Sequence, residues 1–105
     1  MHFIKTESGQ VTNIEAVARF YVTQAVKSDQ NRGITKLVAE LVNGHDAVLA
    51  TFLPLDEASG GQDRAIADAQ LVLNALTHNL RLNEHLIDMR ELRGTTLKAG
   101  ALKVA

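Results

Sequence analysis

Residues 62–82 constrain the fold more than any other segment, because no other segment is both long and regular enough to cover a core alone. The apolar positions in this segment recur at steps of three and four, which is the spacing of one helix face. These positions are Ile66, Ala69, Leu73, Leu76 and Leu80. Only Ile66 and Val72 are β-branched apolar residues, so local propensity agrees with the spacing. We therefore predict a long helix over residues 62–82.

The residues before this helix carry strand and turn signals. Segment 17–27 alternates apolar and polar side chains at a period of two, as expected of a strand with one buried face. Asn43 and Gly44 separate two apolar runs, and an Asn-Gly pair in that position is the strongest short signal for a hairpin. Gly9 marks an earlier turn. We predict an α+β fold: a four-stranded antiparallel β-meander over residues 2–53, followed by a long C-terminal helix packed on one face.

The segment after the helix has a weaker pattern. Residues 83–92 either continue the helix or form a second short one, whereas a strand over residues 85–91 alternates poorly. Gly94 is expected to end the helix, because glycine is a poor helix former. A chain of 105 residues has the size of one domain. We therefore predict a single domain over residues 1–93 and a flexible C-terminal tail over residues 94–105.

The chain has more apolar surface than this arrangement can bury in one subunit. Both predicted hairpin strands, 34–42 and 47–53, place apolar residues on both faces, whereas one helix covers only one face of a sheet. A second apolar stripe runs along the helical region, nearly opposite the first. We predict a homo-oligomer, with a dimer favoured. The predicted interface residues are Leu71, Leu82, Leu86 and Met89.

No group of residues predicts catalysis, a cofactor site or a metal site. The sequence has no cysteine, which excludes thiol catalysis and cysteine ligands. His78 and His85 lie seven residues apart, so their side chains do not converge on one ion as helical ligands at i and i+4 do. No G-x-S-x-G nucleophile elbow occurs. We therefore predict that the protein is not an enzyme.

Single-stranded nucleic-acid binding is the alternative prediction. The net charge of −1 gives no global attraction for nucleic acid. One strand face and the hairpin beside it nevertheless combine an aromatic residue with basic residues, the combination that stacks bases and holds phosphates. These residues are Arg19, Tyr21, Lys27, Arg32 and Lys36. Four antiparallel strands followed by one long helix also resembles the order in whirly-type single-strand binders and Pur-alpha-type repeats, which implies the same function. This resemblance lies in the order of elements and assigns no residue.

The sequence contains no signal for a membrane protein. No apolar run approaches the roughly 18 residues of a membrane span, and the N-terminus lacks the basic and apolar regions of a signal peptide. We expect a cytoplasmic protein without membrane partners. The favoured function is a small oligomeric interaction or regulatory module without catalytic activity.

Overall fold

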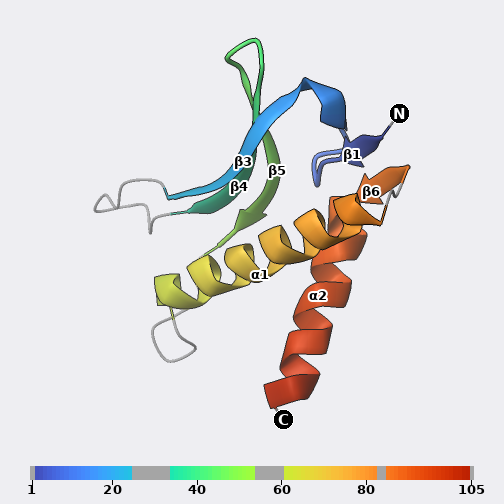
Figure 1. The fold of residues 1–105 in the computed structure, drawn as a ribbon. Helices are drawn as coiled ribbons and strands as arrows, with labels where there is room; N and C mark the ends of the chain where they lie inside the picture. Colours follow the sequence, from blue (N-terminus) through green and yellow to red (C-terminus); the bar gives the residue numbers. More distant parts are fainter. Residues whose placement is uncertain (1, 25–33, 54–60, 83–84, 105) are drawn as a thin grey trace.

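The computed structural model describes residues 2–24, 34–53, 61–82 and 85–104. In chain order, the elements are β1 (Phe3–Lys5), β2 (Val11–Asn13), the 3-10 helix η1 (Ile14–Ala16), β3 (Val17–Gln24), β4 (Thr35–Leu41), β5 (Asp46–Phe52), α1 (Gly61–Arg81), β6 (Leu86–Asp88) and α2 (Met89–Val104). Figure 1 shows β3, β4 and β5 as one curved layer, with α1 running beneath it and α2 crossing α1 near its end. The predicted α+β class is confirmed.

The described strands form two sheets, so the single four-stranded meander predicted over residues 2–53 is wrong. β3, β4 and β5 form a three-stranded antiparallel meander, and the turn containing Asn43 and Gly44 joins its last two strands as predicted. β1 instead lies between β2, which is antiparallel to it, and β6, which is parallel to it. The chain changes sheets at η1, where the Glu15 backbone N–H donates to Asn13 Oδ1 at 2.9 Å. This 3-10 turn ends β2, so the first hairpin does not join β3.

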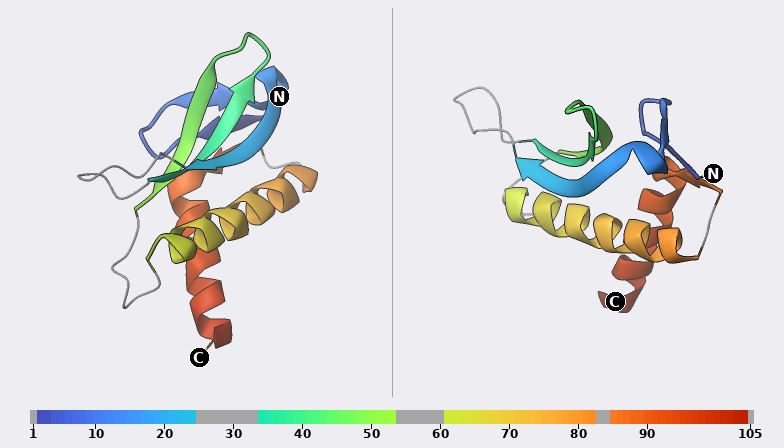
Figure 2. Two further views of the ribbon diagram at one scale, coloured as in Figure 1. Left: turned by 90° about the vertical axis from the view of Figure 1, so that its left-hand side faces the viewer. Right: turned by 45° about the horizontal axis from the view of Figure 1, so that its top comes forward.

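Helix α1 covers the inner face of the β3-β4-β5 sheet (Figure 2). The predicted helix is confirmed, but its most deeply buried row lies slightly to one side of the predicted stripe. That row consists of Ala65, Ala69, Val72 and Leu76, none of them more than 2% exposed. The small alanines let the helix approach the sheet closely, where it packs against the fully buried Leu37, Leu49 and Phe52.

A bulge in the hairpin explains part of the apolar surplus. The β4–β5 register shifts between Leu37 and Val38, so the adjacent residues Leu49 and Ala50 are both buried, at 0% and 1% exposure. On the outer face, Val38 is only 2% exposed beside its cross-strand neighbour Tyr21. The subunit therefore buries more of the hairpin's apolar residues by itself than their poor alternation suggested.

The C-terminal segment differs from the sequence-based prediction in two ways. The chain does not continue as helix through residues 83–92, because Leu86–Asp88 form a strand parallel to β1 that buries Ile87 beside Ile4. Residues 83–84 lie outside the described residues. The helix does not end at Gly94 either, because α2 runs from Met89 to Val104. The expected flexibility of residues 94–105 stays a prediction.

Arg93 of α2 connects the two sheets. Its Nη1 donates to both carboxylate oxygens of Glu7, at 3.0 and 3.1 Å, and to the Thr51 carbonyl oxygen at 2.6 Å. Its guanidinium carbon lies 4.4 Å from the centroid of the Phe52 ring. Glu7, just after β1, also accepts from the Thr51 backbone N–H at 2.9 Å, and its own N–H donates to the Leu49 carbonyl at 3.0 Å. One cation therefore holds β5, α2 and the end of β1 together.

Candidate functional site

The outer face of the β3-β4-β5 sheet carries a connected polar group. Arg19 Nε forms an ion pair and hydrogen bond with Glu40 Oε2, its cross-strand neighbour. The Arg19 guanidinium lies 4.9 Å from the centroid of the Tyr21 ring, a cation–π contact. The Tyr21 hydroxyl donates to Asp46 Oδ2 at 3.0 Å. The arginine and the tyrosine predicted to bind nucleic acid are therefore both engaged by carboxylates of the same chain.

This network also sets the electrostatics of the outer face. The hydrogen bond and the charge interaction with Glu40 raise the pKa of Arg19. Loss of solvent around the phenol and its hydrogen bond to Asp46 raise the pKa of Tyr21 above its ordinary value. Among the described residues of this face, the formal charges of Glu40 and Asp46 offset those of Arg19 and Lys36.

This face carries three of the five residues predicted to bind nucleic acid: Arg19, Tyr21 and Lys36. Arg19 and Tyr21 are alternate residues of β3, and Lys36 pairs with Thr23, the next residue in that alternation, so all three side chains point to the same side of the sheet. Lys27 and Arg32 lie outside the described residues. Sequence reasoning missed Glu40 and Asp46. Glu40 could have been found from the sequence, because it lies four residues after Lys36 in a predicted strand and alternate residues of a strand point to the same side.

The predicted interface residues fall into two environments. Leu71, Leu82 and Leu86 are exposed, at 45%, 60% and 54%. Leu71 lies on α1, Leu82 directly follows the last residue of α1, and Leu86 is the first residue of β6. Met89, by contrast, is fully buried in the core of its own subunit. Met89 is therefore inaccessible in the subunit, whereas the three leucines are exposed on different parts of the chain.

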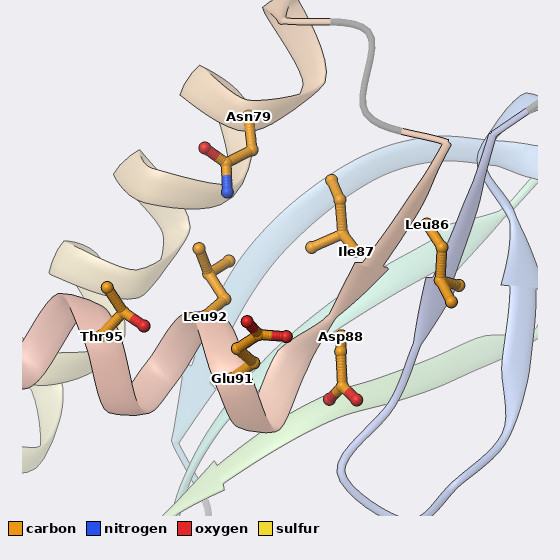
Figure 3. Close-up of a pocket in the computed structure, with 7 residues that line it drawn as sticks. All are labelled: Asn79, Leu86, Ile87, Asp88, Glu91, Leu92 and Thr95. Carbon is orange, nitrogen blue, oxygen red and sulfur yellow. The ribbon is translucent and has the colours of Figure 1, made fainter.

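A small pocket opens beside these leucines, between α1, β6 and α2, with a volume of about 220 Å³. Its lining consists of Asn79 from α1, Leu86, Ile87 and Asp88 from β6, and Glu91, Leu92 and Thr95 from α2. Ile87 and Leu92 face each other across it, and the Asn79 amide points toward Leu92 (Figure 3). Asp88 caps α2, since its Oδ1 accepts from the Arg90 backbone N–H at 3.0 Å. Both charged residues of this lining are acidic.

The histidines do not form a common site. His85 stacks on His2, with ring centroids 5.7 Å apart and planes inclined by 16°, where β1 and β6 begin. His78 lies exposed on α1. Within the described part of the chain, no three His, Cys, Asp or Glu side chains are grouped closely enough to hold a metal ion.

Comparison with known proteins adds no relative. No protein-family model, curated protein or solved structure matches the chain. The element order that resembled the whirly-type and Pur-alpha-type proteins is also absent from the described residues, since their strands do not form one four-stranded sheet. Neither α1 nor α2 combines the length and the hydropathy needed to cross a membrane.

Proposed function

We propose that the protein is a non-catalytic interaction module that self-associates as a homodimer. The observation that carries this proposal is the exposure of Leu82 and Leu86, which are 60% and 54% exposed. Leu82 directly follows α1 and Leu86 is the first residue of β6, and β6 lies beside the end of α1 and the start of α2 (Figure 1). Leu71, on α1, is a third exposed leucine. We call Leu71, Leu82 and Leu86 the leucine strip.

The leucine strip is large enough to drive association only as the centre of a wider interface. Full burial of one leucine contributes about 1.5–3 kcal/mol, so completing the burial of a half-exposed leucine contributes about 1 kcal/mol. Six leucines from two copies then contribute about 6 kcal/mol, which lies within the range of about 4–15 kcal/mol that association costs. A stable dimer therefore needs further contacts around the strip. The C-terminal part of α2 projects beyond α1 and both sheets (Figure 1).

Sedimentation equilibrium of the parent and of two double variants tests the proposal. Leu82→Glu with Leu86→Glu places charges in the strip, and we expect a monomer with an unchanged circular dichroism spectrum. Val11→Glu with Val42→Glu changes two apolar residues outside the strip that are at least as exposed, at 60% and 72%, and we expect the parent's dimer. A parent that stays monomeric at submillimolar concentration, or a strip variant that still dimerises, would contradict the proposal.

Single-stranded nucleic-acid binding through the outer sheet face is the alternative function. Arg19, Tyr21 and Lys36 lie together there, which supports it. The ion pair of Arg19 with Glu40 and the hydrogen bond of Tyr21 to Asp46 weigh against it, because a nucleic acid would have to displace both.

A further inference from the structure

Two of the four histidines lie side by side where β1 and β6 begin. Phe3 pairs with Leu86 in the parallel ladder between these strands. His2 and His85 directly precede these two residues, so they are neighbours at the start of adjacent strands. Their rings are stacked, with centroids 5.7 Å apart and planes inclined by 16°. The fold therefore brings together two imidazoles that are 83 residues apart in the sequence.

Main-chain hydrogen bonds hold both histidines in these positions. The carbonyl oxygen of His85 accepts from the Phe3 N–H at 2.9 Å, and the carbonyl oxygen of His2 accepts from the Ile14 N–H at 3.0 Å. A ligand that binds both imidazoles then has to order only the side-chain torsions, because the backbone of each residue is already placed. A site that is arranged in advance binds more tightly, since less conformational entropy is lost on binding.

The separation of the two imidazoles suits a two-histidine metal chelate. Metal-binding histidines at i and i+4 of a helix start from Cβ atoms about 5–6 Å apart. Neighbours on adjacent strands have a similar separation, because the strands lie about 4.8 Å apart. The stacked rings must tilt toward each other for their nitrogens to reach one ion at about 2.0–2.1 Å.

The ligand type determines which ions the pair selects. Imidazole nitrogen suits Zn²⁺, Cu²⁺ and Ni²⁺, whereas Mg²⁺ and Ca²⁺ prefer oxygen ligands. Within the described part of the chain, no third His, Cys, Asp or Glu side chain joins the pair. Two ligands do not form the closed four-ligand shell of a structural zinc site, so water completes the coordination of the ion.

We infer that His2 and His85 bind one divalent transition-metal ion of this class, which bridges β1 and β6. The inference does not depend on the proposed homodimer, because both ligands come from one chain. β6 ends at Asp88 and α2 begins at Met89, so the ion fastens to β1 the strand that leads into the C-terminal helix. Binding stabilises the folded state, because only the folded chain places the two imidazoles next to each other.

Isothermal titration calorimetry of the untagged full chain with ZnCl₂, NiCl₂ and MgCl₂ tests the site. We expect one Zn²⁺ or Ni²⁺ per chain and no binding of Mg²⁺. His2→Phe and His85→Phe each keep an aromatic ring for the stack but remove a ligand. Each should weaken Zn²⁺ binding at least about tenfold, since the loss of a group that merely supports a ligand already costs that much. His78→Phe changes an exposed histidine of α1 and is the matched control, which should bind Zn²⁺ as the parent does.

Hydrogen exchange measured by NMR distinguishes a bridge between the strands from binding to one histidine. The Phe3 N–H, which donates to the His85 carbonyl, should exchange more slowly when Zn²⁺ is added to the parent, and His85→Phe should abolish this protection. A parent that binds neither Zn²⁺ nor Ni²⁺ would overturn the inference. Binding that survives either His2→Phe or His85→Phe, or that is lost in His78→Phe, would place the ion elsewhere. Binding without added protection of Phe3 would show that the ion does not hold β1 to β6.

Discussion

At the scale of the residue, Tyr21 allows the outer face to be probed directly, because it is the only tyrosine in the chain. Its pKa is raised by loss of solvent and by the hydrogen bond to Asp46. A raised pKa means that the folded state holds the phenolic proton more tightly than the unfolded chain does. The protonated phenol of Tyr21 therefore stabilises the folded state. This stabilisation is complete below the pKa of tyrosine in the unfolded chain, about 10, and it is lost as pH rises through the pKa of Tyr21 in the folded state.

Replacing Asp46 by Asn should therefore lower the pKa of Tyr21 toward its ordinary value. An absorbance titration of the tyrosinate band measures this pKa without interference, and Asp63→Asn, on the first turn of α1, serves as the control that leaves it unchanged. A parent protein whose tyrosine titrates at the ordinary value would show that the hydrogen bond at 3.0 Å is not maintained in solution.

Arg93 is the residue whose loss should destabilise the fold most among the charged groups. Arg93→Ala leaves the half-buried Glu7 carboxylate without its cation and removes the contact with the Phe52 ring. We expect the free energy of unfolding to fall by about 2–3 kcal/mol in urea titrations. Arg64→Ala removes the more exposed Arg64–Asp68 pair on α1 and should cost about 0.5 kcal/mol or less. Equal losses in the two variants would mean that Arg93 does not connect the sheets as described.

At the scale of the element, Gly94 and Gly44 form a matched pair for testing α2. Gly94 lies inside the helix, its φ is not positive, and a methyl group at this position would meet no atom within 4 Å. Gly94→Ala should therefore stabilise the protein by about 0.5–1 kcal/mol. Gly44 is equally open but has a φ of +90°, so Gly44→Ala should destabilise it. Thermal unfolding measures both changes. A neutral or destabilising Gly94→Ala would indicate that α2 does not continue through this position.

The elements that could be predicted from the sequence are those specified by local signals. α1 follows from its apolar spacing, and the β4–β5 hairpin follows from Asn43 and Gly44. β6 could not be predicted in this way, because its three residues become a strand through parallel pairing with β1, where Ile87 pairs with Ile4. A run that short is equally compatible with a helix when its partner is unknown. The prediction that Gly94 ends the helix was wrong, because the weak local preference of glycine against helix is overridden by the packing of α2 against α1.

At the scale of the whole molecule, the candidate sites depend on register and on contacts between distant segments. The sequence pattern grouped Leu71, Leu82, Leu86 and Met89 as one interface, but it could not separate the buried Met89 from the exposed leucines, because burial depends on how α2 is placed. The sequence pattern also placed Arg19 and Tyr21 on one face but did not predict their acidic partners. Asp46 lies close to Tyr21 only because β3, β4 and β5 pair in this register. Residues brought together by tertiary structure leave no periodic trace in the sequence.

The charge balance of the outer sheet face leads to a prediction for the nucleic-acid alternative. Glu40→Gln combined with Asp46→Asn removes both carboxylates of the network and changes the net charge from −1 to +1. If these acids mask the face, the parent should not bind a short single-stranded oligonucleotide in low-salt fluorescence anisotropy. The double variant should then bind weakly, with an affinity that falls as salt rises. Tyr21→Ala in the variant should weaken binding further, because stacking on the ring contributes about 1–3 kcal/mol per base. Salt-dependent binding by the parent itself, lost on Tyr21→Ala, would instead establish the alternative function, since a nucleic acid would then displace Glu40 and Asp46 unaided.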